Sequence, residues 1–378
     1  MSPIQVQPVT TRRQLRAFVR FPWQVYENDP NWVPPLLSER LAYLDPTQGP
    51  FYRHADVALL AARRDRKVVG TIAAFVDHHQ IEHTGEQEGG FGFFEVLEEY
   101  AVAEQLLDAA CAWLREHKMP RVRGPTSFSM NDTPGVLIEG ADCPPAMLEA
   151  HTPLYYARFL EQYGMEKDHD LYAWRAFRSQ FGPKLEAALP ELAQVADVAR
   201  QRYGVTTRKV RMEEWASEIA IVHHLFDATL KTLPGHVPIT EPEFQRMAAQ
   251  FRAFLDPDLA FFAEVDGQPV GFFVAFPDIN RALIHLNGRL FPFGWLKLRR
   301  SIRQIDVASF KLMGVLEAYR RRGIDALLYL EGIQAFLDKG YAWLDGSVTS
   351  EKNPMINLIA GRLGAERYKL YRLYQMAL

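Results

Sequence analysis

Apolar and polar positions follow the same succession of patterns twice along the chain. Short apolar runs flank a polar turn at Asp65-Arg66 in residues 57–77, and a matching arrangement surrounds Asp266-Gly267 in residues 259–278. Five identical residues recur 201 positions later: Val69, Gly70, Ala74, Phe75 and Asp77 are repeated as Val270, Gly271, Ala275, Phe276 and Asp278. Two β-rich runs separated by a two-residue polar turn are typical of a hairpin, so we expect one β-hairpin in each half.

Helical spacing follows each predicted hairpin. Apolar residues recur three and four positions apart in residues 104–117 and again in 325–339, which predicts one long helix in each half. A later helix begins at Pro153 in the first half and at Pro354 in the second, and each ends at a glycine. The order in each half is helix, hairpin, strand, helix, strand, helix and strand. This order favours an α/β or α+β sheet covered by helices.

The repeat predicts two domains of similar architecture. We expect an N-terminal domain at residues 1–180 and a C-terminal domain at 181–378, each a mixed, mostly antiparallel sheet flanked by helices. The length of 378 residues suits two domains, and Phe181-Gly182-Pro183 interrupts a polar stretch at the predicted boundary. One large domain with a chance resemblance between its halves is the alternative interpretation.

Composition narrows the class of protein. The hydrophobic content of 48% excludes disorder over most of the chain, and the net charge of −3 argues against a dedicated nucleic-acid-binding protein. Two cysteines do not make a disulfide framework, which favours a reducing compartment. No apolar run approaches the roughly 18 residues of a membrane helix, and the start of the chain does not resemble a signal peptide. We therefore expect a cytoplasmic protein with no nucleic-acid partner and no membrane partner.

The strand, turn and helix predicted within residues 311–328 carry the strongest chemical signal. Three arginines precede a glycine where the helix is predicted to begin: Arg320, Arg321, Arg322 and Gly323. The first helical turn leaves N–H groups unpaired and carries partial positive charge, and a glycine lets the backbone approach an anion closely. The pattern therefore predicts a site for two linked phosphates, although a carboxylate at Asp325 would compete for the same N–H groups.

The same segment resembles a signature of the GNAT acyltransferase superfamily, Arg-x-x-Gly-x-Gly/Ala between the fourth strand and the following helix. Arg320, Gly323 and Ile324 match this signature, whereas Asp325 stands where the second glycine or alanine is expected. The helix that begins at Asn353-Pro354 is similar to a later helix of the superfamily. The resemblance covers residues 215–374 and, more weakly, part of the first half. The chain as a whole is thus similar to a bacterial branch of tandem GNAT-like proteins.

The resemblance implies an N-acyltransferase that moves an acetyl or other acyl group from coenzyme A to an amine of a small molecule. Acetyl-CoA or another acyl-CoA would be the co-substrate. The residues assigned to it are Met313, Val315, Arg320, Arg321, Arg322, Gly323, Ile324, Ala326 and Asn353. The acyl end would lie between two splayed strands, with its thioester carbonyl near the backbone of Gly314 or Val315, where an N–H would polarise it.

Acyl transfer to an amine also needs a base for the amine proton and an acid for the leaving thiolate. Related enzymes often use a tyrosine in the helix after the asparagine, but positions 358–360 here hold Leu, Ile and Ala. We take Asp345 and Tyr371 as the candidate catalytic residues. The alternatives are that Asp345 caps a turn at the end of a strand and that Tyr371 packs in the core. Other candidates of the same kind are Tyr368, Tyr374 and Asp306.

The first half lacks the basic, glycine-bearing turn. Its corresponding segment, residues 97–104, is acidic and would repel a pyrophosphate, so we expect no coenzyme A there. The loop at 124–135 is polar and rich in turn residues, and such a loop can line a pocket. Within it, Asn131 and Asp132 are candidate substrate contacts.

Two further clusters have an ordinary structural explanation. His78, His79 and His83 fall in a predicted polar loop with no cysteine beside them, so we expect solvated histidines and no metal. Residues 295–303 form a basic amphipathic stretch, which we interpret as covering the core with its arginine heads in water. Contact with a membrane surface or with the 3′-phosphate of a nucleotide is the alternative interpretation.

Three functions fit these patterns. The first is an acyl-CoA-dependent N-acyltransferase with its site in the second half. The second is a non-catalytic tandem protein that binds or scaffolds, which Asp325 and the missing tyrosine favour. The third is a Fem-type aminoacyl transferase, which would need a tRNA-binding face. Stabilisation by acetyl-CoA would separate the first two. The sequence leaves open the acceptor, the acyl length and whether two copies pair as a homodimer.

Overall fold

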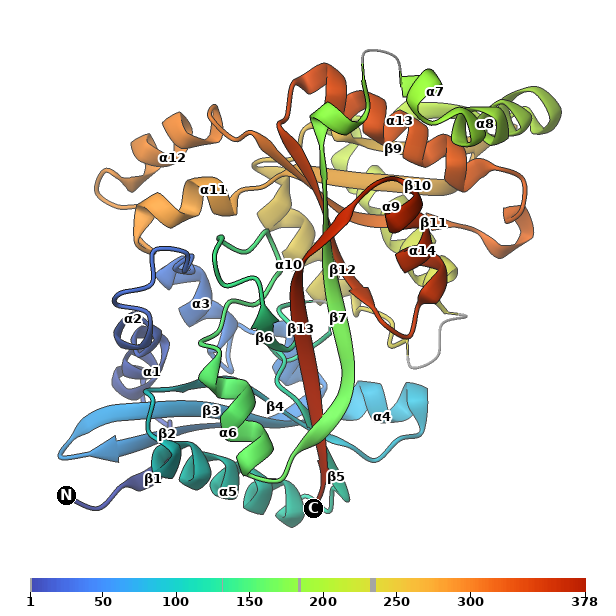
Figure 1. The fold of residues 1–378 in the computed structure, drawn as a ribbon. Helices are drawn as coiled ribbons and strands as arrows, with labels where there is room; N and C mark the ends of the chain where they lie inside the picture. Colours follow the sequence, from blue (N-terminus) through green and yellow to red (C-terminus); the bar gives the residue numbers. More distant parts are fainter. Residues whose placement is uncertain (1, 131, 183–184, 232–235) are drawn as a thin grey trace.

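One β-sheet runs through both halves of the chain (Figure 1). The computed structural model describes residues 2–130, 132–182, 185–231 and 236–378. The strands follow the order β1-β2-β3-β4-β5-β13-β7-β12-β11-β10-β9-β8, and β6 pairs with β13 beside this path. Helices flank the sheet, and the mixed, mostly antiparallel architecture predicted from the sequence is confirmed.

Each half contains the predicted order of helix, hairpin, strand, helix, strand, helix and strand, together with elements that the sequence did not predict, among them β1, β6 and β8. The strands are β1 (Gln5–Pro8), β2 (Ala55–Arg64), β3 (Lys67–Asp77), β4 (Gly89–Val96), β5 (Arg121–Gly124), β6 (Val136–Glu139), β7 (Glu166–Phe177), β8 (Thr206–Lys209), β9 (Ala260–Val265), β10 (Gln268–Pro277), β11 (Val307–Val315), β12 (Trp343–Ser350) and β13 (Glu366–Ala377). The helices are α1 (Arg12–Arg20), α2 (Pro22–Val25), α3 (Leu37–Tyr43), α4 (His78–Thr84), α5 (Tyr100–Glu116), α6 (Tyr155–Gln162), α7 (Leu185–Ala188), α8 (Pro190–Tyr203), α9 (Trp215–Leu230), α10 (Glu241–Arg252), α11 (Asn280–Leu283), α12 (Gly294–Ile302), α13 (Ile324–Lys339) and α14 (Pro354–Arg362).

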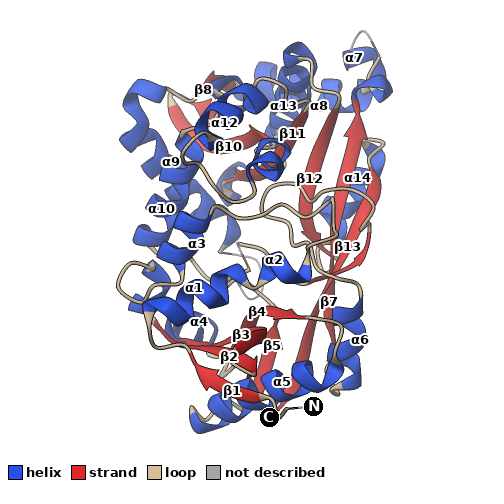
Figure 2. Ribbon diagram, turned by 90° about the vertical axis from the view of Figure 1, so that its left-hand side faces the viewer, coloured by secondary structure: helices blue, strands red, loops and turns tan. Residues whose placement is uncertain are grey.

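The last strand of each half completes the sheet of the other half. β7, from the first half, pairs with β12 of the second, and β13, from the second half, pairs with β5 of the first. β7 and β13 also pair with each other, so they form the seam of the molecule. Figures 1 and 2 show both strands running between the two parts of the fold. The predicted division at residue 180 therefore follows the repeat in sequence, whereas hydrogen bonding crosses it in both directions.

Both predicted hairpins are confirmed. β2 pairs with β3 and β9 with β10, each around a two-residue turn. Asp65 and Arg66 have φ of 48° and 68°, and Asp266 and Gly267 have φ of 52° and 74°. Two successive residues with positive φ match the turn whose twist suits the twist of paired strands.

The aspartate that ends each hairpin closes the same kind of turn. Asp77 accepts hydrogen bonds from the N–H groups of His79 and Gln80 at the start of α4, and Asp278 accepts from the N–H of Asn280 at the start of α11. Residues 78–84 are therefore a helix capped by Asp77, which corrects the loop predicted there. Aspartate is a favoured N-cap residue, so the repeated Asp77 and Asp278 could have predicted that a helix begins directly after each hairpin.

The long helix of each half covers one face of the sheet. α5 buries Leu106, Leu107 and Leu114 against β2 and β3, and α13 buries Leu328 and Phe336. In both halves this helix lies between two parallel strands, β4 and β5 or β11 and β12. Because each parallel pair holds together over only a few residues, a gap opens between its strands near the start of the helix.

Candidate active site

The gap in the second half lies between β11 and β12. The two strands are paired as far as Phe310–Gly346, and beyond it the pairs that the structure describes for β12 are those with β7. Val315 ends β11, and the next residue, Leu316, donates from its N–H to Val270 of β10 at 2.9 Å. Because successive strand residues point their N–H and C=O groups to opposite sides, those of Val315 face away from β10 and into the gap.

Val96 is the matching residue of the first half. Val96 pairs with Gly70 in β3, as Val315 pairs with Gly271 in β10. The N–H of Val96 donates to the hydroxyl of Tyr156 at 2.9 Å, and its carbonyl accepts from Tyr155 at 2.7 Å. Both tyrosines belong to α6, so in the first half the groups that would face a ligand are already bonded to protein. This arrangement gives a physical reason for the expectation that no coenzyme A binds there.

Asp345 and Tyr371, the predicted catalytic residues, are joined through two further side chains where β11 and β12 separate. The hydroxyl of Tyr368 lies 3.0 Å from Asp345 and 3.2 Å from Glu149. The hydroxyl of Tyr371 donates to the same Glu149 at 3.2 Å. Asp345 also accepts hydrogen bonds from Ser309 at 2.5 Å and Lys311 at 3.0 Å. The result is a buried hydrogen-bond network that connects Asp345, Tyr368, Glu149 and Tyr371 in this order.

Burial controls the protonation of this network. Loss of solvent and the nearby charge of Asp345 raise the pKa of Glu149 to about 7, although Lys311 and Lys369 act in the opposite direction. Burial and neighbouring carboxylates also raise the pKa values of Tyr368 and Tyr371 well above the ordinary tyrosine value, so both remain protonated. Glu149 therefore exchanges its proton near neutral pH, as a general base must.

The start of α13 has one feature that suits a phosphate. Gly323 stands at the N-cap with φ of 78°, and α8 packs directly against it, since a Cβ would collide with the carbonyl oxygen of Val195. Among the described residues, the N–H groups of Ile324, Asp325 and Ala326 make no hydrogen bond. Asp325 is exposed and does not occupy these N–H groups, so the first turn of α13 fits an anionic group.

The three arginines of this turn differ in their contacts. Arg320 donates to the carbonyl of Val315 at 3.3 Å and to that of Thr229 in α9 at 2.8 Å, so it holds the turn closed. Arg322 donates to the carbonyl of Ala318 and lies over the rings of Tyr319 and Tyr203. Arg321 is exposed and adopts a φ of 62°. Arg321 is thus the cation of the turn that solvent and a ligand reach most directly.

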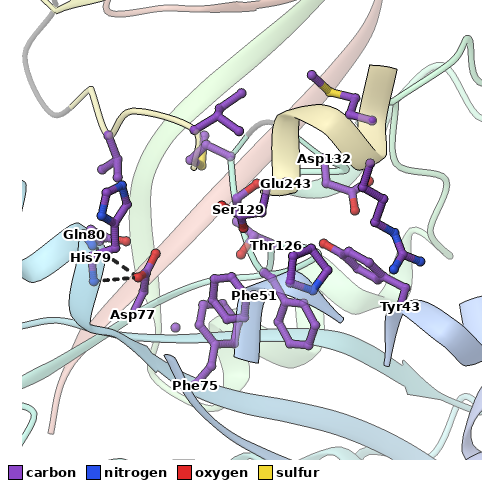
Figure 3. A pocket seen from close by; sticks show the side chains of 18 of the residues that line it. Tyr43, Phe51, Phe75, Asp77, His79, Gln80, Thr126, Ser129, Asp132 and Glu243 are labelled. Carbon is purple, nitrogen blue, oxygen red and sulfur yellow. Dashed lines mark hydrogen bonds between the residues drawn. The ribbon is translucent and has the colours of Figure 1, made fainter. Parts of the chain in front are cut away.

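A cavity of about 340 Å³ lies between the sheet of the first half and α10 of the second (Figure 3). It is lined by α3, β3, α4, α10 and residues 236–239 before α10. The loop after β5 contributes Thr126, Phe128, Ser129, Met130 and Asp132. Its volume is in the range of small-molecule sites. Aromatic side chains, among them Phe51 and Phe75, form one wall, and Asp77, Asp132 and Glu243 bring carboxylates to it.

His54 joins the two halves at this cavity. Its Nδ1 lies 2.9 Å from Asp77 of β3, and its Nε2 lies 3.3 Å from Glu243 of α10, a distance without good hydrogen-bond geometry. Burial opposes a charge on the imidazole, but the two carboxylates outweigh it and raise the pKa of His54 to about 9. His54 is therefore a cation at neutral pH and links the halves electrostatically.

Solved structures share the architecture of this chain. A tandem GNAT protein from the clavulanic acid biosynthesis pathway superimposes with a TM-score of 0.57 at 13% identity, over 99% of this chain and 98% of that one. A GCN5-related N-acetyltransferase from Sphaerobacter thermophilus does so with a TM-score of 0.52 at 14% identity, over 100% and 97%. These similarities identify the fold as the tandem GNAT fold.

Sequence similarity decides the family. No family model matches the chain. It is 35% identical to Protein YghO of Escherichia coli (strain K12) over 376 residues, which is 98% of this chain and 94% of that protein. It is 32% identical to the bacterial ceramide synthase of Caulobacter vibrioides, over 99% of this chain and 98% of that one. The chain belongs to the same family as these two proteins, and its fold is the tandem GNAT fold.

The structure of this tandem GNAT protein brings some predicted site residues together and separates others. The predicted co-substrate residues from Met313 to Ala326 form one continuous strand end, turn and helix start, and Asn353 caps α14 by accepting from the N–H of Ile356. Asp345 lies inside β12 rather than at its end, so it does not cap a turn. Asp132 lines the cavity, and Asn131 lies outside the described residues. Their roles stay predictions.

Two groups of this tandem GNAT protein were missed by sequence reasoning. Glu149 follows a proline-containing loop and carries no motif, so only the fold reveals that it meets Tyr368 and Tyr371. His54 lies just before β2, 23 positions from Asp77. The repeat pointed to Asp77, but the contact of His54 with Glu243 joins the two halves and has no signature in sequence.

The histidines of α4 form a compact cluster. Ligand atoms of His79, Glu82 and His83 lie within 4.8 Å of one another. His79 Nε2 is 2.9 Å from the carbonyl of Pro238, which positions one ring beside the cavity. The absence of a metal here remains a prediction from the sequence, which metal analysis of the purified protein would check.

No helix within the described parts of the tandem GNAT protein is long and apolar enough to cross a membrane.

Proposed function

We propose that this chain is an N-acyltransferase that transfers an acyl group from a coenzyme A thioester to an amine. The observation that carries the proposal is the connected set of Asp345, Tyr368, Glu149 and Tyr371 where β11 and β12 separate. A thioester in this gap would meet the N–H of Val315 and a group able to exchange a proton near neutral pH. The first turn of α13 would hold the pyrophosphate.

The reaction uses the chain's own groups in a simple order. The cationic amine first loses one proton to the solvent, and its neutral nitrogen then attacks the thioester carbonyl, so that a C–N bond forms and the C–S bond breaks. The proton lost by the attacking nitrogen passes to Glu149 by way of the hydroxyl of Tyr368, the residue of the network with the largest exposed fraction, 9%. The N–H of Val315 stabilises the developing oxyanion. The departing thiolate takes its proton from water, and Glu149 releases the amine proton to the solvent, which neutralises the hydroxide and restores the base.

The cavity between the halves is the proposed chamber for the acceptor. Leu148 lines the cavity, and the next residue, Glu149, belongs to the proton-exchanging network. α9 contacts the turn before α13 through Thr229, and residues 236–239 after it line the cavity. Apolar walls with carboxylates suit a molecule that has a cationic amine and a hydrocarbon body.

The family relationship favours a lipid-like acceptor. A relative of nearly the same length is named a bacterial ceramide synthase, and a ceramide is a long-chain amino alcohol acylated on nitrogen. We therefore infer that the acceptor is a long-chain amine and the donor a long-chain acyl-CoA. The apolar lining of the cavity, with Phe51, Phe75 and Phe128, supports this choice over a small polar amine.

A thiol-release assay tests the proposal. Purified protein is mixed with acyl-CoA thioesters of increasing chain length and with amines that are either short and polar or long-chain amino alcohols. We expect free coenzyme A and the corresponding amide, detected by mass spectrometry, only with long-chain amines. Thermal stabilisation by acyl-CoA alone should accompany activity. Absence of both stabilisation and product with every pair would contradict the proposal in favour of a non-catalytic protein.

A further inference from the structure

An exposed apolar segment precedes and begins α12. Phe291 is 81% exposed, Phe293 68%, and Trp295 and Leu296 48% each. α12 itself buries none of its residues completely, and it lies at the outer edge of the molecule beside α11 (Figure 1). Large apolar side chains in water are unfavourable, so a run of four within six positions, three of them aromatic, marks a surface that another phase or molecule covers.

The same segment is strongly basic. Residues 291–303 contain Lys297, Arg299, Arg300 and Arg303 and no acidic residue, in a chain whose net charge is −3. These four cations form neither an ion pair nor a hydrogen bond with any described residue. Positive charge is therefore concentrated here and remains available to an external anion.

The segment is anchored to the protein on one side only. Leu298 and Ile302 of α12 pack against the core beneath, whereas Phe291, Phe293 and Leu296 remain exposed. The sequence-based interpretation, that residues 295–303 cover the core, therefore applies to two positions one helical turn apart. The exposed aromatic residues and the free cations need a different explanation.

We propose that residues 291–303 bind the surface of an anionic lipid bilayer. The aromatic rings of Phe291, Phe293 and Trp295 would enter the headgroup region, and the four cations would contact lipid phosphates. Charge complementarity selects this occupant, because a second copy would bring the same cations face to face across a two-fold axis. The proposal replaces the expectation, drawn from the sequence, that the protein has no membrane partner.

The segment adjoins the edge of the cavity. The carbonyl of Gly288, three residues before Phe291, accepts a hydrogen bond from the N–H of Leu37 at 3.0 Å. Trp23 donates to Asn287 at 2.6 Å, and Pro35 and Leu36 line the cavity. A lipid that left the bilayer at α12 would therefore reach the part of the cavity wall that precedes and includes α3. Bilayer binding does not depend on acyl transfer and is tested separately.

Vesicle flotation tests the proposal. Full-length protein is mixed with vesicles of phosphatidylcholine alone or of phosphatidylcholine with phosphatidylglycerol. We expect flotation with the anionic vesicles only, and its loss at high salt, because the lipid phosphates are screened. Phe291→Ala/Phe293→Ala and Arg299→Glu/Arg300→Glu should each lower the partition coefficient at least about ten-fold.

Two matched controls isolate the segment. Arg12→Glu/Arg16→Glu makes the same charge change on α1, an exposed basic helix without exposed aromatic neighbours. Met355→Ala/Leu358→Ala removes side chains that are 63% and 50% exposed on α14. Both control variants should float within about two-fold of wild type.

Three outcomes would overturn the proposal. One is wild-type protein that floats with neither vesicle, and another is equal losses in test and control variants. The third is a wild-type dimer, seen by sedimentation, that Phe291→Ala/Phe293→Ala converts to a monomer without changing flotation. That outcome would assign the surface to a second copy of the chain.

Discussion

The hydroxyl of Tyr368 lies 3.0 Å from the carboxylate of Asp345, although β7 separates their strands in the sheet. The contact depends on the exchange of terminal strands, because β13 comes from the end of the chain and meets β12 only across β7. The proposed catalytic network is therefore assembled by the seam between the halves. Disturbing either end of the network should affect chemistry more than folding.

Glu149→Gln should abolish the proposed proton exchange while keeping the shape of the side chain. We expect kcat to fall about 100-fold or more, because general acid–base groups contribute factors of this order. Glu161→Gln is the matched control, since Glu161 also accepts from a tyrosine, Tyr374, at 2.9 Å, but is itself exposed on α6. Steady-state kinetics on both variants checks the prediction. Equal losses in the two variants would remove Glu149 from the mechanism.

The pH dependence of folding gives a second test of Glu149. The pKa of Glu149 is raised from 4.5 to about 7 in the folded protein. Between these two pH values the folded state still holds the proton, whereas the unfolded chain has lost it. Stability should therefore fall as pH rises from about 4.5 to about 7, and Glu149→Gln should remove this part of the slope. Urea unfolding of both proteins across this range measures the difference. Parallel pH profiles would contradict the burial of an ionisable Glu149.

His54 should stabilise the fold more at low pH than at high pH, whereas burial alone lowers the pKa of a histidine and has the opposite effect. Its pKa is raised to about 9, above the ordinary value, so the protonated form stabilises the fold fully below about pH 6.5 and this contribution is lost as pH rises through 9. His54→Gln should cost on the order of 2 kcal/mol at pH 6 and much less at pH 10. Chemical denaturation at the two pH values checks this, with His78→Gln, on the exposed pair with Asp56, as the control. A cost independent of pH would mean that His54 acts by packing alone.

The sequence predicted the repeated elements better than their assembly. Hairpin turns at Asp65 and Asp266 are local, since two residues with positive φ specify the turn. The helix that starts after Gly323 was also predictable, because glycine and the following apolar spacing are local signals. The exchange of β7 and β13 between the halves could not be predicted, because both strands would carry the same alternating pattern whichever half they joined. For the same reason, the contacts of Tyr368 with both Asp345 and Glu149 had no signal in the chain.

Tyr156, whose hydroxyl bonds the N–H of Val96 in the first half, should contribute to the stability of the fold and not to binding of the acyl-CoA donor. Tyr156→Phe leaves the buried N–H of Val96 without its 2.9 Å partner, which should cost about 1–3 kcal/mol. Tyr163→Phe is the control, because its hydroxyl meets Asp108 at an exposed position and its loss should cost less than about 0.5 kcal/mol. Denaturation midpoints give the stabilities, and thermal shifts with acyl-CoA give the donor response. A weaker donor response in Tyr156→Phe would indicate that the first half binds the thioester.

Gly323→Ala tests the turn on which donor binding depends. The residue has φ of 78°, and a Cβ would meet the carbonyl of Val195, so we expect a loss of about 2 kcal/mol or more. Gly361→Ala in α14 is the matched control, since nothing lies within 4 Å of its Cβ position and alanine favours a helix by up to about 1 kcal/mol. If the first turn of α13 binds the pyrophosphate, the thermal shift with acyl-CoA should vanish in Gly323→Ala, measured where the variant remains folded, and persist in Gly361→Ala. A full acyl-CoA response in folded Gly323→Ala would place the donor elsewhere, because displaced N–H groups in this turn could not bind two linked phosphates as before.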